Sequence, residues 1–310
     1  TGAQAQAAPP SASGDAARAG AAVSSSSAVR RTRLASWAHT SGVHSMAVME
    51  GEGSYEGLLR AATDGSLAPS IVAGIDLDVP RTFFASCPPG GQASSEALSR
   101  LLRVLAVWDP ELGYCQGLNF IAAFALLAAR MEEGPEGPQP QQVDGKETGS
   151  DGAAALGEEA VAFWLVANLM QGYGARGLFL RRTPLLKLYC FCLTRLLEQH
   201  LPEEHGLLDD LGPVLGFKWF GTLFTTLLPL EAVARAWDAL FHDGLPMLLR
   251  LGLGLCELVS PLLREAREAG EDAVAAWGRL QRQLPKDASP LLPASWESSC
   301  GEALPAAAAE

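Results

Sequence analysis

The segment Asp109-Pro110-Glu111-Leu112-Gly113-Tyr114-Cys115-Gln116-Gly117-Leu118-Asn119 is a polar break between two strongly apolar stretches. Pro110 disfavours the α conformation of the residue before it, so the upstream helix is expected to end at Trp108. Residues 120–131 are almost wholly apolar, which predicts a second, buried helix that begins near residues 115–116. Upstream, apolar residues recur at helical spacing, at Leu98, Leu101, Leu102, Leu105 and Trp108.

Gln116 is an unexpected residue for the first turn of a buried helix. Burying an unpaired carboxamide costs about 1–3 kcal/mol, so either a group inside the fold satisfies the amide or the amide faces a partner. On this segment alone, an amide bonded to nearby backbone is the preferred interpretation. A second motif, Ile75-x-x-Asp78-x-x-Arg81, reverses that preference.

The composition favours one large helical domain with flexible ends. Of the 310 residues, 48% are hydrophobic, which is ample for a core, while the 32 Gly and 20 Pro concentrate at the ends and in one internal patch. The formal net charge of -12 argues against non-specific binding to nucleic acid or to anionic lipid, since both select clustered Lys and Arg. A soluble protein is expected.

Cysteine spacing and hydropathy argue against a zinc-binding protein and against a membrane-spanning protein. The six cysteines form no CxxC pair and have no histidine at zinc spacing, which indicates reduced, cytosolic thiols and no metal site. The stretch Leu245–Leu263 comes nearest to a membrane span, but it contains Arg250 and Glu257. We therefore expect no transmembrane segment and a cytoplasmic location.

Biased composition divides the chain into four parts. Residues 1–28 are dominated by Ala, Ser, Gly and Pro without an aromatic residue, which predicts a disordered lead-in. A helical domain is expected over 29–285, interrupted by an acidic low-complexity insertion at 132–157 that is predicted to be a disordered surface loop. Within it, residues 145–148 lack the strand and the full motif of a phosphate loop. Residues 286–310 form a tail rich in Pro, Ala and Ser.

The rest of the sequence predicts one helix after another, with short breaks at Gly, Pro or Asp and no credible sheet. An all-α fold is therefore expected, a single large non-bundle helical domain. The predicted helices are 55–62, 71–81 (a short helix or turn), 96–108 with Ser95 as N-cap, 115–131, 158–170, 185–200, 207–215, 219–227, 230–241, 247–263 and 272–284.

Two motifs, Ile75-x-x-Asp78-x-x-Arg81 and Tyr114-x-Gln116-Gly117, occur in this order, with Arg81 and Gln116 separated by 35 residues. Together they resemble the two signature motifs of the TBC domain, the catalytic module of GTPase-activating proteins for Rab GTPases. The resemblance covers roughly residues 30–285. It extends to Arg33 and Trp37, which are similar to the family's first helix, and to the later signature Trp219-Phe220-x-x-Leu223-Phe224, Arg235-Ala236-Trp237-Asp238, Phe241, Gly244 and Arg250.

This resemblance implies that Arg81 and Gln116 are catalytic fingers inserted into a GTP-bound Rab. GTP hydrolysis passes through a loose transition state with charge on the phosphoryl oxygens, so an arginine supplied in trans accelerates it by about 10³–10⁵. A carboxamide can orient the attacking water without a change of protonation. The family would need no cofactor of its own, because GTP and Mg²⁺ are carried by the Rab.

Supporting roles are implied for residues beside the two fingers. Asp78 lies three residues before Arg81 and is expected to aim its guanidinium; the alternative is a surface ion pair worth less than about 1 kcal/mol. Tyr114 and Asn119 are expected to brace the glutamine turn. Gly117 either admits the partner's backbone or is a packing glycine.

Further expectations concern the core, the segment after Arg81 and the cellular setting. Trp219, Phe220 and Trp237 are expected to pack in the core. In the family a proline often follows shortly after the Arg-Thr pair, whereas residues 83–85 here are Phe-Phe-Ala, which leaves the conformation after the finger open. A Rab partner implies membrane trafficking, with peripheral recruitment to membranes through the Rab. The alternative function is a non-catalytic Rab-binding adaptor or scaffold with the same fold.

Overall fold

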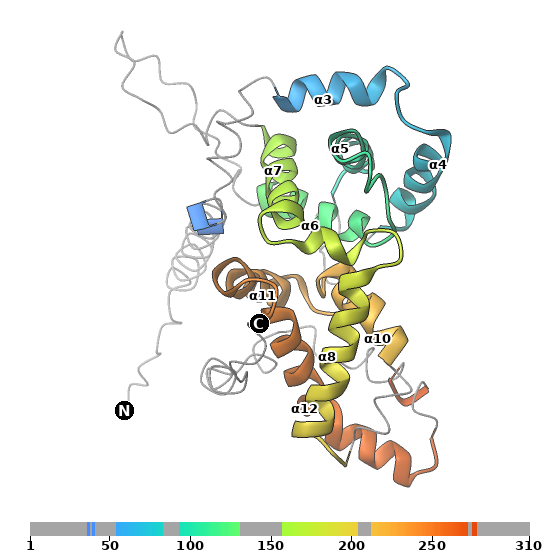
Figure 1. Cartoon of the computed structure of the whole chain (residues 1–310), viewed down its shortest axis with the longest axis vertical. Coiled ribbons are helices and arrows are strands. Elements are labelled where there is room, and N and C mark those ends of the chain that lie inside the picture. The colour runs from blue at the N-terminus through green and yellow to red at the C-terminus, as the bar shows by residue number, and fades with distance from the viewer. Residues whose placement is uncertain are drawn as a thin grey trace, which may run out of the picture.

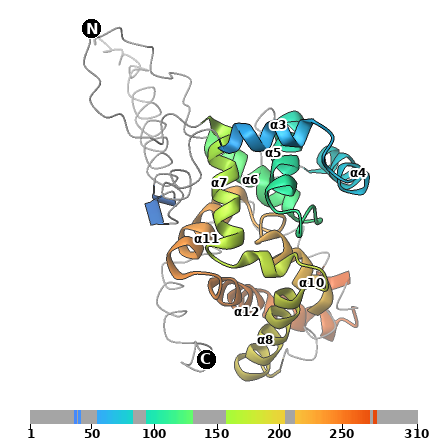
Figure 2. The same cartoon turned by 45° about the horizontal axis from the view of Figure 1, so that its top comes forward.

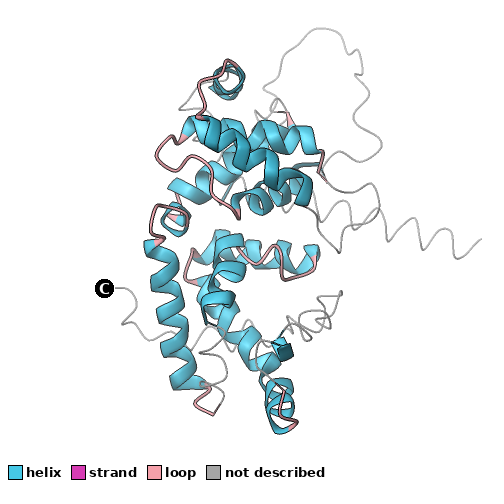
Figure 3. Cartoon of the chain, turned by 90° about the vertical axis from the view of Figure 1, so that its right-hand side faces the viewer, coloured by secondary structure: helices cyan, strands magenta, loops and turns pink. Residues whose placement is uncertain are grey.

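The computed structural model describes residues 36–37, 39–40, 54–82, 93–130, 157–203, 212–271 and 275–277. Every regular element in these ranges is helical, which confirms the all-α prediction (Figure 3). The elements are α3 (Ser54–Thr63), α4 (Pro69–Asp78), η1 (Val79–Arg81), α5 (Ser95–Trp108), α6 (Leu118–Arg130), α7 (Glu158–Gln171), η3 (Ala175–Leu178), α8 (Pro184–His200), α10 (Gly212–Trp219), η4 (Phe220–Thr222), α11 (Leu230–Asp243) and α12 (Met247–Glu268), where η marks a 3₁₀ turn.

The helices gather in two halves. Helices α3 to α7 form the upper half of Figure 1, and α8 to α12 form the lower half; the tilted view of Figure 2 shows the same division. Helix α5 is central to the upper half, since it contacts α3, α4, α6 and α7. Its predicted apolar stripe is the buried face, with Leu98, Leu101, Leu102 and Leu105 all at most 6% exposed.

An aromatic cluster joins the two halves. Phe124 of α6 meets Trp237 of α11 edge to face, with ring centroids 4.7 Å apart. Trp37 packs against both of these rings and against Phe241, and its Nε1 donates to Asp238 Oδ1 at 2.7 Å. Trp237 is 1% exposed, as predicted for a core residue.

Helix α6 begins at Leu118, so the predicted start at residues 115–116 is wrong. Gly117 has φ +108°, which lies outside the right-handed helical region and keeps residues 114–117 out of the helix. The predicted burial of the helix itself is confirmed, because Ile121, Ala122 and Ala125 are fully buried.

The predicted helix 219–227 is also wrong. Helix α10 ends at Trp219, the turn η4 follows, and Leu223 and Phe224 take φ values of +47° and +63°. The segment is rich in apolar residues because almost all of them are buried: Trp219, Phe220, Leu223 and Phe224 are all at most 1% exposed. Burial on all sides removes the contrast between faces on which a periodicity prediction depends.

The remaining boundaries differ from the predictions by a few residues. The cap of α5 is Ser94, whose hydroxyl accepts from the amide of Ala97 at 3.4 Å, and Ser95 is the first helical residue. Helix α12 extends to Glu268, beyond the predicted end at residue 263. Of the predicted final helix, 272–284, the structure describes 275–277, which are helical.

Several predictions concern residues outside the described part of the chain. These are the lead-in 1–28, Arg33, residues 83–85, the insertion 132–157 apart from Gly157, the phosphate-loop-like residues 145–148, residues 207–211 of the predicted helix 207–215 and the tail 286–310. Within the described part, no helix has the length and apolar character needed to cross a membrane.

The central position of α5 predicts which leucines stabilise the fold. Leu101→Ala, at a fully buried position of α5, should lower the free energy of unfolding by about 2–5 kcal/mol through lost burial and a residual cavity. Leu258→Ala is the matched control, because Leu258 is 44% exposed on α12 and its truncation should cost about 1 kcal/mol or less. Urea unfolding of the two variants measures the difference, and equal losses would contradict the assigned core.

Candidate functional site

Arg81 reaches the surface at the end of a helix that a proline terminates. Pro69 occupies the start of α4, and Val79 donates the last α-helical bond, to the carbonyl of Ile75. Pro80 has no amide hydrogen with which to continue the ladder, so the chain tightens into the turn η1. The Arg81 side chain projects from this turn and is 61% exposed, as expected for a residue that meets a partner.

Two bonds orient the Arg81 guanidinium. Its Nε donates to the carbonyl of Leu77 at 3.0 Å, and its Nη2 donates to Asp78 Oδ1 at 2.6 Å. Together they occupy two of the five N–H groups that a guanidinium presents. Asp78 thus fixes the direction of Arg81 while most of the cation stays in solvent.

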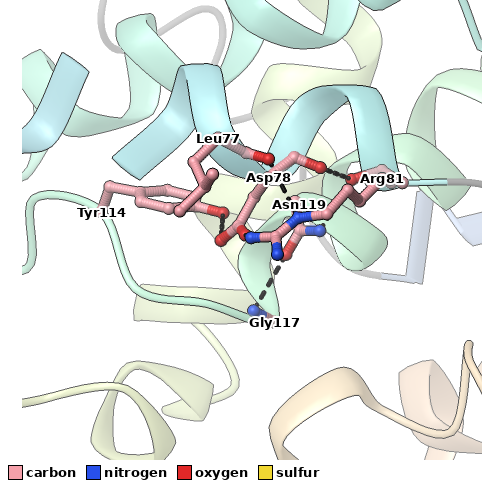
Figure 4. A network of polar contacts seen from close by, with 7 residues as sticks. Leu77, Asp78, Arg81, Tyr114, Gly117 and Asn119 are labelled. Carbon is pink, nitrogen blue, oxygen red and sulfur yellow. Dashed lines mark hydrogen bonds and ion pairs between the residues drawn. The ribbon is translucent and has the colours of Figure 1, made fainter. Parts of the chain in front are cut away.

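The Asp78 carboxylate also receives Tyr114, which comes from the other motif. Tyr114 Oη donates to Asp78 Oδ2 at 2.7 Å, so that Tyr114 and Arg81 approach the carboxylate from opposite sides (Figure 4). The tyrosine ring lies against Gly74 of α4, where a Cβ would come 3.1 Å from it. Burial, followed by the bond to Asp78, raises the pKa of Tyr114 far above its usual value, so its hydroxyl remains a donor at neutral pH.

The carbonyl of Asp78 is connected to the glutamine segment through two further side chains. Thr82 Oγ1 donates to this carbonyl at 2.8 Å and accepts from Asn119 Nδ2 at 2.7 Å. Asn119 Oδ1 in turn accepts from the backbone N–H of Gly117 at 2.9 Å. The structure therefore brings the predicted residues Asp78, Arg81, Tyr114, Gly117 and Asn119 into one hydrogen-bonded network (Figure 4).

Gln116 stands in the turn between Tyr114 and Gly117 and is exposed. Because Gln116 lies outside the helix and in water, its carboxamide needs no internal partner, and the free-energy cost of burying it does not arise. The exposure agrees with an amide that faces a partner and argues against the alternative of an internally bonded one.

Gly117 is buried, and other atoms of the protein occupy the space that a side chain would need. A Cβ at this position would overlap the carbonyl oxygen of Gly221, which lies in the turn η4. The space is therefore filled by the chain's own backbone, so that of the two alternatives for Gly117 the structure favours the packing glycine over close approach by a partner.

Arg176 is a site residue that sequence reasoning missed. From the turn η3 it binds both carboxylate oxygens of Asp109, with Nε to Oδ2 at 2.5 Å and Nη2 to Oδ1 at 2.9 Å, and it reaches Glu111 Oε2 at 2.7 Å. Asp109 Oδ1 also accepts from the amide of Leu112 at 3.1 Å. Arg176 thereby fixes the segment that leads into the glutamine turn.

The Arg176 guanidinium lowers the pKa of Asp109, and the amide of Leu112 adds to this effect. Asp109 is 6% exposed, so a carboxylate there requires such a partner. The sequence indicated only that a carboxylate stands between an apolar helix and a proline. It could not indicate which of the many arginines pairs with it, since the two residues are 67 positions apart.

No metal centre is assigned to the site. Among the residues that the structure describes, no group of three or more His, Cys, Asp or Glu side chains is arranged to hold a metal ion. The site presents two groups to solvent: the Arg81 guanidinium, held by Asp78 and the Leu77 carbonyl, and the Gln116 carboxamide, whose backbone neighbours Tyr114 and Gly117 are hydrogen-bonded.

Comparison with known proteins identifies the family to which the chain belongs. The model of the family described as the Rab-GTPase-TBC domain matches residues 32–263, which is well over half of the chain. This chain belongs to the Rab-GTPase-TBC domain family. The matched range lies inside the helical domain predicted at 29–285 and includes both motifs.

Relatives of this TBC domain include proteins from yeast, worm and human. GTPase-activating protein GYP5 of Saccharomyces cerevisiae is 32% identical over 186 residues, 59% of this chain and 17% of the yeast protein. Growth hormone-regulated TBC protein 6 of Caenorhabditis elegans is 28% identical over 220 residues, 67% of this chain and 58% of the worm protein. TBC1 domain family member 1 of Homo sapiens is 28% identical over 217 residues, 67% of this chain and 15% of the human protein. The chain thus spans less than two thirds of the length of each.

Two solved structures share the TBC fold. The Ypt/Rab-GAP domain of Gyp1p matches with a TM-score of 0.64 at 17% identity, covering 88% of this chain and 87% of that domain. The Chlamydomonas flagellar RabGAP TBC domain matches with a TM-score of 0.61 at 22% identity, covering 84% and 78%. These matches agree with the all-α architecture of this TBC domain.

The contact between Gly117 and Gly221 predicts a steric requirement in the TBC domain. Gly117→Ala should lower the free energy of unfolding by about 2–5 kcal/mol, because the new Cβ adds an overlap with Gly221 to the strain of a left-handed φ. Gly65→Ala is the matched control, since Gly65 has φ +84° but nothing within 4 Å of its Cβ position, and should cost about 1–2 kcal/mol. Equal losses on urea unfolding would argue against the packing contact.

The ion pair between Arg176 and Asp109 predicts a pH-dependent contribution to stability. The folded pKa of Asp109 lies below its unfolded value of about 3.9, so the contribution is complete above that pH and is lost as the pH falls through the folded pKa. Asp109→Asn should lower the free energy of unfolding by about 1–3 kcal/mol at pH 7, with the difference from wild type shrinking below about pH 4. Denaturant midpoints measured from pH 7 to pH 2.5 test this, and parallel curves would contradict it.

Proposed function

We propose that this TBC domain accelerates the hydrolysis of GTP bound to a Rab-family GTPase, with Arg81 and Gln116 as fingers supplied in trans. The observation that carries the proposal is the network that ties the turn bearing Arg81 to the turn bearing Gln116 while both side chains stay exposed. A surface ion pair without function would not require a second motif to be connected to it.

Arg81 is suited to stabilise charge on the transferring phosphoryl group. A guanidinium offers a rigid fork of donors that matches the oxygens of a phosphoryl group. The Leu77 carbonyl accepts from Nε and Asp78 accepts from Nη2, which leaves three of the five N–H groups of this 61% exposed side chain for a partner. Removing an arginine finger costs about 10³–10⁵ in rate.

Gln116 is suited to place the attacking water. Its amide can accept a hydrogen bond from water and donate one to a phosphoryl oxygen, with no change of protonation. Effective catalysis of this kind depends on position, because errors of about 1 Å cost about 10²-fold. The bonds of Tyr114 and Gly117 on either side hold the backbone from which the amide extends.

The nucleotide and Mg²⁺ come with the Rab in this proposal, so the TBC domain has no cofactor of its own. Asp78, Tyr114 and Asn119 act as positioning residues. Peripheral recruitment to trafficking membranes, from the cytoplasm, follows from binding a Rab there. Among the relatives, the yeast protein GYP5 is itself named a GTPase-activating protein.

A single-turnover GTP hydrolysis assay over a panel of GTP-loaded Rabs tests the proposal. Wild type should accelerate hydrolysis by at least one Rab, Arg81→Ala should reduce the accelerated rate by about 10³–10⁵, and Gln116→Ala by about 10²–10³. Arg60→Ala and Gln199→Ala are matched controls, because both residues are exposed on helices α3 and α8 outside the network, and should retain wild-type rates.

Two outcomes would overturn the catalytic role. Full activity of Arg81→Ala or Gln116→Ala would exclude the fingers as assigned. Binding to a GTP-loaded Rab without faster hydrolysis by wild type would replace catalysis with the adaptor function.

A further inference from the structure

Gln116 stands between two anchored residues, and both anchors lead to the same turn. On one side the Tyr114 hydroxyl donates to the Asp78 carboxylate at 2.7 Å. On the other side the Gly117 amide donates to Asn119 Oδ1 at 2.9 Å, and Asn119 continues to Thr82. The glutamine turn is therefore attached to the arginine turn by two separate routes.

The second route has only one possible arrangement of hydrogens. A backbone N–H can only donate, so the atom of Asn119 that faces Gly117 is its carbonyl oxygen, and the NH₂ group faces Thr82. Thr82 Oγ1 must then accept from Asn119, and its own proton goes to the carbonyl of Asp78 at 2.8 Å. Thr82 thus uses both functions of its hydroxyl, and Asn119, 2% exposed, has little access to water as a substitute.

Gly117 is where such an attachment matters most. Glycine at φ +108° has more conformational freedom than any other residue type, and it directly follows Gln116. Without the Thr82 hydroxyl, the Asn119 NH₂ group would lose the partner that fixes the orientation of the Asn119 side chain, and the bond from the Gly117 amide to Asn119 Oδ1 would be weakened, while the packing of Gly117 against Gly221 would remain.

We propose that Thr82 is a positioning residue: its hydroxyl, through Asn119, sets the position of Gln116 relative to Arg81, in parallel with the bond of Tyr114 to Asp78. This inference rests on the proposed function for its effect on hydrolysis. Its effect on the loop itself can be measured in the free TBC domain, without a Rab.

The first test compares Thr82→Val, which removes the hydroxyl at nearly constant shape, with Thr82→Ser, which keeps it. Thr82→Val should lower the single-turnover rate at saturating TBC domain about tenfold, and Thr82→Ser should stay within about twofold of wild type. Thr63→Val is the matched control, since the Thr63 hydroxyl bonds only carbonyls of its own helix, those of Leu59 and Arg60. Thr82→Ala removes the same hydroxyl should the valine variant fail to fold.

Binding separates positioning from simple loss of structure. Affinity for a Rab loaded with a non-hydrolysable GTP analogue should be unchanged in Thr82→Val, while affinity for the Rab with GDP and aluminium fluoride, which mimics the transition state, should fall about tenfold. A parallel arrangement further predicts that Thr82→Val combined with Tyr114→Phe loses more than the product of the single losses. Equal losses in both binding measurements would overturn the positioning role.

Hydrogen exchange in the free domain decides the inference independently of activity. The Gly117 amide should exchange at least about tenfold faster in Thr82→Val than in wild type, and at the wild-type rate in Thr82→Ser. Unchanged exchange in Thr82→Val would overturn the link whether or not any Rab is stimulated. If wild type stimulates a Rab and Thr82→Val is as active, the inference fails and the proposed function stands.

Discussion

The site depends on the carboxylate of Asp78. This residue is 8% exposed, and a carboxylate so removed from water is stable only when donors surround it. Two donors come from different segments of the chain, the guanidinium of Arg81 and the hydroxyl of Tyr114, and its backbone carbonyl takes a third from Thr82. One buried anion therefore holds together two motifs that are separated in sequence, and their geometry follows from its need for partners.

The segment 109–117 is also held by residues of two 3₁₀ turns. Arg176 clamps Asp109 at its upstream end, and Gly221 leaves no room for a side chain at Gly117 at its downstream end. Both contacts come from turns: η3 packs against α7 and α8, and η4 packs against α6, α8 and α10. Movement of the two halves relative to each other would therefore change the position of the turn that carries Gln116.

The fold was predictable from sequence where one face of a helix is buried and the other is not. The leucine stripe of α5 met this condition, so its place and its end before Pro110 agree with the prediction. The segment 219–227 did not, because burial on all sides hides a turn as readily as a helix. Within the site, Arg81 and Gln116 are marked by short motifs, whereas Arg176 and Gly221 act through contacts over distances in the chain that no local pattern contains.

Gln116 can stand between two apolar helices because its neighbours, and not its own side chain, anchor the turn. Gly117 and Asn119, on the C-terminal side, are buried and bonded, and Tyr114 is anchored on the other side, so the fold is satisfied without the side chain of Gln116. Exposing one amide costs little, since water meets its hydrogen-bonding needs. A residue that positions a reactant from outside the GTPase needs a fixed backbone and a solvated side chain. The conformational entropy of the loop is then lost when the domain folds and does not reduce the free energy of binding.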